Sequence, residues 1–247
     1  MCNQYSPSDP HIVALHFRVQ PPAEQYKRGI GLWGRGPFVR NTEAGRQAIV
    51  GQWALIGDSA REARSSARIM TNNARSESVA TKPTFRGPWS RGQRCLIPAD
   101  SFLEPNWESG QNQWWRVRRS DDAPFGLAGL WNTWTDKTTG EIVASYTMLT
   151  INADADPLMS RMHKPAPKLP DSGVRGAAWS LTNCNHHDYD GLSAVPTDQR
   201  HAARAPKRCG QISLQRTGCP WWERCAAPYR PDAGCHAEWL RRSPRRL

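Results

Sequence analysis

Short apolar runs and apolar–polar alternation, separated by turn-forming residues, predict a series of strands in the first 165 residues. The predicted strands are residues 53–56, 94–98, 114–117, 125–131 and 145–150. A turn is expected at 136–140, and 156–162 is the best candidate for a short helix. Because the strands follow one another closely and do not alternate regularly with helices, the pattern predicts a β-rich α+β fold with few helices.

This pattern ends near residue 165. Residues 166–247 are rich in Arg, Pro, Cys and paired Trp, and prolines interrupt every segment that is long enough to pack as a helix or strand. We therefore expect one domain over residues 1–165, followed by a basic tail over 166–247 that is disordered.

Composition indicates a polyanionic partner. The 247 residues have a mean hydropathy of −0.70 and a formal net charge of +11, which favours nucleic acid, and some of the 12 Trp side chains could stack on bases. The chain holds no apolar run of about 18 residues and no signal-like run near its start. We expect a cytoplasmic or nucleoid-associated monomer without membrane contact. Among the 7 cysteines no pair has CxxC spacing, so neither a zinc site nor another cofactor is predicted.

The cysteine at position 2 is the most reactive candidate. Methionine aminopeptidase can remove Met1 before a residue as small as Cys2, which leaves an α-amine and a thiol on adjacent carbons. An α-amine titrates near ~7.7–8.0 and a free thiol near ~8.5, so both are partly in their reactive forms at neutral pH. Such a 1,2-aminothiol condenses with an aldehyde to an imine, and its thiol then closes a five-membered thiazolidine.

Four other segments carry polar or aromatic side chains that could join this chemistry. They are NNARSE at 72–77, RCLIPADSFLE at 94–104, AGLWNTW at 128–134 and SRMHKP at 160–165. Each is weak alone, because a single carboxylate at a strand end or a single histidine usually has a structural role. The order and the residues of these motifs, together with Cys2, resemble the SOS-response-associated peptidase (SRAP) family over residues 1–165.

The resemblance implies a curved, barrel-like antiparallel sheet and covalent reaction with abasic sites in single-stranded DNA, in the DNA damage (SOS) response. The positions that match the family's catalytic residues are Cys2 as nucleophile, Asn73 as the amide that orients it, Glu104 as general acid and His163 as the histidine that closes the site. The expected DNA contacts are Arg75 and Arg161 on phosphate, and Trp53, which either packs beneath the site or stacks on a base. Arg86, Arg91 and Arg94 are further candidate phosphate contacts.

These residues suit the chemistry that the resemblance implies. An opened abasic deoxyribose presents an aldehyde to the Cys2 amine, and Glu104 can help water leave the carbinolamine. The same groups could hydrolyse the bond after Met1 or reverse the crosslink, so a hydrolase or lyase is expected.

The chain departs from the family in four places, one of which is Ala54 and Gly57, where members have Gly and Pro after the strand tryptophan. Asn3 and Gln4 stand where many members have Gly-Arg, and Leu103 and Pro105 replace the usual neighbours of the acid. After His163 the family continues with a strand and a closing helix, and neither is predicted here. One hypothesis is that the coding frame shifts after this point.

Two other function classes stay open on the sequence alone. One is an N-terminal-nucleophile amidohydrolase, in which Cys2 attacks an amide with its own amine as base. The other is a basic nucleic-acid-binding module in which Cys2 has no role and the tail binds.

Overall fold

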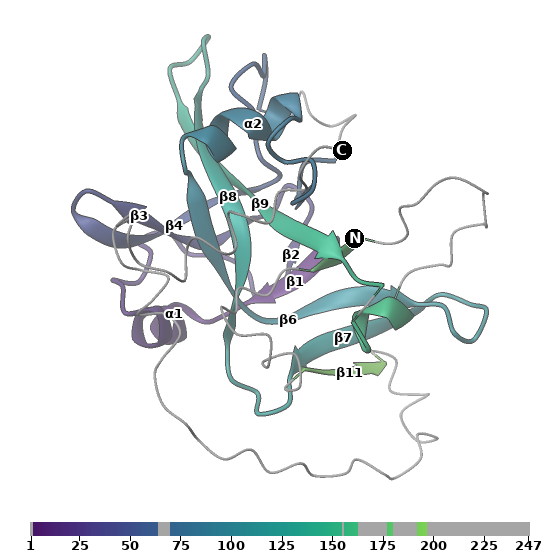
Figure 1. Cartoon of the computed structure of the whole chain (residues 1–247). Coiled ribbons are helices and arrows are strands. Elements are labelled where there is room, and N and C mark those ends of the chain that lie inside the picture. The colour runs from purple at the N-terminus through teal and green to yellow at the C-terminus, as the bar shows by residue number, and fades with distance from the viewer. Residues whose placement is uncertain (1, 64–69, 155, 163–176, 180–191, 197–247) are drawn as a thin grey trace, which may run out of the picture.

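The computed structural model describes residues 2–63, 70–154, 156–162, 177–179 and 192–196 (Figure 1). The strands are β1 (Gln4–Pro7), β2 (Ile30–Gly31), β3 (Arg35–Thr42), β4 (Gly45–Trp53), β5 (Asn73–Arg75), β6 (Arg94–Asn106), β7 (Gln113–Arg119), β8 (Phe125–Thr135), β9 (Ile142–Asn152), β10 (Ala177–Trp179) and β11 (Leu192–Pro196). Two α-helices, α1 (Pro10–Phe17) and α2 (Pro83–Ser90), and the 3₁₀ turn η2 (Met159–Arg161) complete the described elements.

Five strands close into a barrel. β3 pairs with β4, β4 with β9, β9 with β8, β8 with β6, and β6 with β3, which returns to the first strand. Inward-facing side chains such as Phe38, Ile97, Leu127 and Tyr146 fill the interior and are at most 2% exposed. The β-rich prediction and the barrel are confirmed, but the expected antiparallel order is wrong at β9, whose pairs with β4 and β5 are parallel.

β6 extends beyond the barrel and carries a second group of strands. Its first half pairs with β8 and β3, whereas its second half pairs with β1 on one side and β7 on the other. β2 adds to β1, and β11 adds to β7, so that β6, β7 and β11 run side by side in Figure 1. The start of the chain therefore lies against the centre of the sheet.

Four of the five predicted strands are present, each longer than predicted. They correspond to β6, β7, β8 and β9, and the turn at 136–140 is confirmed by the hydrogen bond from Gly140 N to Asp136 O. The strand expected at 53–56 is wrong, because β4 ends at Trp53. Residues 54–56 are buried, but Ile56 N donates to the Ser145 side chain, which takes it out of the ladder. The helix expected at 156–162 is reduced to η2.

Two strands occur where no strand was expected. β10 pairs with β9 and β11 pairs with β7, both beyond residue 165. The prediction that strands end at that point is therefore wrong for these eight residues. The rest of 166–247 lies outside the described residues, so disorder or a shifted frame stays a prediction there. In the described part of the chain no helix has the length and apolar character needed to cross a membrane.

Candidate functional site

Two consecutive asparagines hold Cys2 by its carbonyl oxygen. The Nδ2 atoms of Asn72 and Asn73 each lie 2.9 Å from Cys2 O and donate to it. Asn73 begins β5, which runs parallel to β9 and pairs Asn73 with Met148. Cys2 is 0% exposed and lies two residues before the first residue of β1, so the sheet holds both partners close to their places. The structure thus brings together two of the residues that the sequence singled out.

The environment of Cys2 favours the neutral thiol. Its Sγ donates to Gln4 O at 2.9 Å. Burial is the larger cause that raises the pKa of this thiol well above its ordinary value, and the negative charge of Glu104 raises it further. The thiol is therefore protonated at neutral pH, and a reaction at sulfur requires a group that takes its proton.

Glu104 lies near Cys2, on the second half of β6. Its side chain is 0% exposed, and its register partner across the ladder is Trp115 of β7. Residues opposite each other in a ladder share a face, so the Trp115 ring and the Glu104 carboxylate lie on the same side of the sheet. Both groups are buried, and the charge of Glu104 raises the pKa of the Cys2 thiol, so the ionisation of one affects that of the other.

Trp53 packs beneath this site. Its side chain is 0% exposed, its ring lies edge-on to Tyr5 with centroids 5.1 Å apart, and its Nε1 donates to Asn72 O at 2.9 Å. The ring is packed in the core, as one of the two alternatives for this residue expected, and the DNA contact stays a prediction. Asn72 was missed in the sequence, where the only signal was its amide next to Asn73.

The predicted DNA-contacting arginines differ in what they already bind. Arg75 ends β5 and is exposed. Arg161 forms a two-point ion pair with Glu108, at 2.8 and 2.9 Å, and its guanidinium lies 5.5 Å from the Trp115 ring centroid. Arg91 is paired in the same way with Asp58. Arg75 is therefore the better placed of the three for a phosphate, and its role stays a prediction.

His163 falls outside the described residues, directly after η2 and Met162. Met162 forms an isolated β-bridge with Asn106, the last residue of β6. Asn106 also donates through Nδ2 to Arg161 O at 3.3 Å. Residues 161 and 162, which directly precede position 163, are therefore held at Asn106. Asn106 is the last residue of β6 and lies two residues after Glu104 in the chain.

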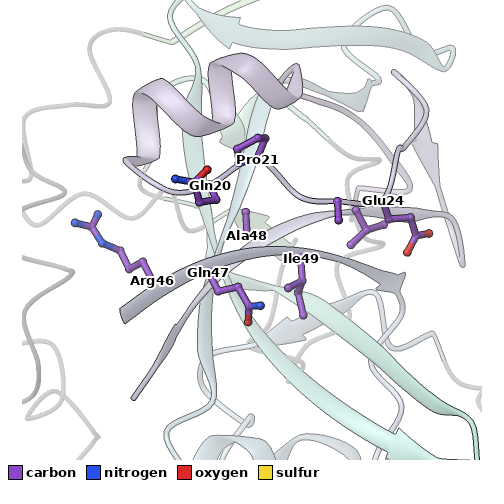
Figure 2. A pocket seen from close by; sticks show the side chains of 9 residues that line it. Gln20, Pro21, Glu24, Arg46, Gln47, Ala48 and Ile49 are labelled. Atoms are coloured by element: carbon purple, nitrogen blue, oxygen red, sulfur yellow. The ribbon is translucent and has the colours of Figure 1, made fainter. Parts of the chain in front are cut away.

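A shallow groove elsewhere on the barrel has no site residue in its lining. Its volume is about 480 Å³, and it lies between the segment after α1 and β4 (Figure 2). Gln20, Pro21 and Glu24 line one side, and Arg46 and Ile49 line the other. In the described ranges no three His, Cys, Asp or Glu side chains are grouped so as to hold a metal ion. The buried cluster around Cys2 is thus the best candidate site.

The chain is similar to known proteins over much of its length. A family model described as SOS response associated peptidase (SRAP) matches residues 1–190, past the boundary predicted at 165. The chain is 25% identical over 147 residues to the abasic site processing protein HMCES of Gallus gallus, covering 52% of this chain and 43% of that protein. It is 32% identical over 119 residues to the abasic site processing protein YoaM of Bacillus subtilis, covering 48% of this chain and 50% of that one. The chain spans about half the length of these curated relatives.

Two solved structures share the fold. A crystal structure of a protein from Bordetella bronchiseptica superposes with a TM-score of 0.66 at 30% identity, covering 80% of this chain and 100% of that one. A second, from Bacteroides thetaiotaomicron, gives a TM-score of 0.60 at 18% identity, covering 84% of this chain and 97% of that one. The second likeness concerns the fold alone.

Proposed function

Because this chain belongs to the SOS response associated peptidase (SRAP) family, we propose that it processes abasic sites in DNA with Cys2 as the nucleophile. The observation that carries the proposal is the burial of Cys2 beside Glu104, with its carbonyl held by Asn73. The names of the relatives HMCES and YoaM, both abasic site processing proteins, support the substrate class.

The proposed reaction requires the α-amine of Cys2, so Met1 must first be removed, either by an aminopeptidase or by the site itself. The freed amine adds to the aldehyde carbon of the opened abasic sugar and gives a carbinolamine. Glu104 then gives a proton to the leaving hydroxyl and takes the remaining proton from nitrogen, so that one water leaves and the neutral imine forms. The thiol then adds across the C=N bond: sulfur binds carbon and the thiol proton passes to nitrogen. The products are one thiazolidine crosslink and one water.

The electrostatics around Cys2 fit these steps. A thiol whose pKa is raised keeps its proton while the amine reacts first, and Glu104 is the near group that can pass that proton from sulfur to nitrogen afterwards. Asn73 Oδ1 is buried and has no hydrogen-bond partner among the described residues. Since the same amide already contacts Cys2, we assign Oδ1 as the acceptor for the freed α-amine.

We propose single-stranded DNA as the partner. The sugar aldehyde must be reached outside a base stack, and a flipped or single-stranded nucleotide costs less to bind than a paired one. The net charge of +11 supports attraction to a polyanion that weakens with added salt. Exposed Arg75, two residues after Asn73 on β5, is the proposed phosphate contact.

Substitution of the proposed nucleophile, Cys2, tests the proposal. Cys2→Ala should abolish the SDS-stable complex with abasic single-stranded DNA while it preserves binding to the same strand without the lesion. Cys95→Ser is the matched control, because Cys95 is also a buried free cysteine but lies in the barrel core. Undiminished crosslinking by Cys2→Ala would overturn the proposal. A trapped acyl-enzyme without reaction towards abasic DNA would favour an amidohydrolase instead.

A further inference from the structure

We propose that Asn72 is a second positioning residue for Cys2 and that Trp53 holds Asn72 in place. The inference rests on the proposed function, because it concerns how the nucleophile of that reaction is aimed. It assigns roles to two buried residues: Asn72 contacts Cys2 directly, and Trp53 acts through Asn72.

Asn72 is fixed at both ends. Its side-chain Nδ2 donates to Cys2 O at 2.9 Å and to Asn3 Oδ1 at 3.3 Å. Its backbone oxygen accepts from Trp53 Nε1 and from Met148 N, both at 2.9 Å. Asn72 is 1% exposed, so water does not compete for these bonds. The strand β9 and the Trp53 indole thus determine where the amide points.

Two amide donors on one carbonyl constrain Cys2 more than one donor can. A carbonyl oxygen has two lone pairs, and Asn72 and Asn73 occupy both. A single hydrogen bond allows the peptide plane to rotate about it, whereas two donors from adjacent residues fix that plane. With the plane fixed, the amine and thiol of Cys2 can still turn about the Cα–C bond, and the hydrogen bond from Sγ to Gln4 O at 2.9 Å limits that rotation.

The constraint matters because a reacting cysteine would be the first residue of the chain. Terminal residues are poorly ordered unless they are tied down, and disorder at Cys2 would spread the amine and thiol over many directions. A misplacement of about 1 Å in a reacting group can cost on the order of 100-fold in rate. The double amide contact replaces the constraint that a preceding peptide would otherwise give.

The test compares two buried asparagines. Asn72→Ala should lower the single-turnover rate of crosslinking at saturating abasic DNA by roughly 10- to 100-fold, with an unchanged Kd for lesion-free DNA. Asn132→Ala is the matched control: Asn132 is 2% exposed and donates to Ile56 O at 2.8 Å, away from Cys2. It should lower the melting temperature but leave the rate unchanged when each variant is assayed well below its own Tm. A merely structural role for Asn72 would make the two variants behave alike.

Trp53→Phe supplies a second variant if Asn72→Ala does not fold. It keeps an aromatic ring in the core but removes the donor to Asn72 O, so the rate should fall in the same direction by a smaller factor. If both variants crosslink at the wild-type rate, the inference is overturned and the proposed function stands. If Asn72→Ala does not fold, a wild-type rate in Trp53→Phe alone overturns it. Absence of any crosslink in the wild-type protein would instead overturn the proposed function.

Discussion

Burial and charge act in the same direction on the Cys2 thiol. Desolvation disfavours the thiolate, and the neighbouring Glu104 carboxylate disfavours it further, so the pKa is raised by both. Many reactive cysteines have the opposite environment, with cations or helix N-termini that lower the thiol pKa. A thiol that stays protonated suits a reaction in which the amine attacks first and sulfur closes a ring afterwards.

Glu104→Gln should change two measurements in opposite directions. Removal of the carboxylate charge should lower the pKa of the Cys2 thiol, so the pH profile of Cys2 alkylation, followed by peptide mass analysis, should shift to lower pH. Crosslinking to abasic DNA should slow by about 10²- to 10⁴-fold, because the general acid is lost. Glu77→Gln is the control, since Glu77 is an exposed carboxylate beyond β5. An alkylation profile that does not move would contradict the coupling.

The sequence singles out Cys2, Asn73 and Glu104 through the order of the motifs that contain them and the resemblance of that order to a family. It could not identify the role of Asn72, since this depends on two contacts to backbone oxygens that only the folded sheet brings together. It predicted a phosphate contact for Arg161 and could not show the ion pair with Glu108, which lies 53 positions earlier in the chain. A sequence gives the type of each side chain directly, whereas the partner that a side chain binds depends on tertiary contacts.

At the scale of elements, β6 connects the barrel to the site. It is 13 residues long, and its far end reaches η2 through Asn106 and the pair between Arg161 and Glu108. This attachment holds the turn that leads towards position 163 against the same strand that carries Glu104. Glu108 has its pKa lowered to about 2, chiefly by hydrogen bonds from Arg161 and Asn106.

Glu108→Gln should remove part of the acid sensitivity of the fold. Because the folded pKa of Glu108 is about 2, below its ordinary 4.5, ionised Glu108 stabilises the protein above pH 4.5, and this contribution is lost as the pH falls towards 2. The melting temperature of the variant should therefore be lower than that of the wild type at neutral pH, with a difference that shrinks towards pH 2. For Arg161→Gln too, the difference in melting temperature from the wild type should shrink as the pH falls towards 2. A difference that stays constant with pH would contradict the ion-pair origin.

Strands with strong apolar character were predictable, and strands with mixed character were not. β8 and β9 were found because their residues are buried along most of their length. β3 and β4 were missed, since Arg, Asn and Gln stand at exposed positions among their apolar residues. The parallel pairing of β9 with β4 and β5 has no local signal in the sequence, because register and direction are set by closure of the barrel.

Closure of the whole barrel requires close packing between β6, β8 and β9. Gly129 of β8 pairs with Cys95 on one side and with Met148 on the other. A Cβ atom added at Gly129 would lie 2.6 Å from Thr147 O and 2.9 Å from Cys95 Sγ. The first of these is a backbone atom, which cannot move away without opening the ladder.

Gly129→Ala should therefore destabilise the entire fold, by about 1–3 kcal/mol in the free energy of unfolding measured with denaturant. Gly29→Ala is the control, because a Cβ there would meet only Gln4 Nε2, at 3.8 Å. The site residues would keep their contacts in the folded fraction, so the crosslinking rate per folded molecule should not change. Equal stability of the two variants would show that the barrel adjusts at this point.

The burial of Cys2 has a practical consequence for recombinant production. Its side chain is 0% exposed and its carbonyl is held by two amides. A purification tag fused before Cys2 would therefore have to start from a buried residue. Such a fusion would either break the contacts of Asn72 and Asn73 with the Cys2 carbonyl or block the α-amine. Expression vectors for this protein should carry the tag at the other terminus, or one whose protease leaves Cys2 first.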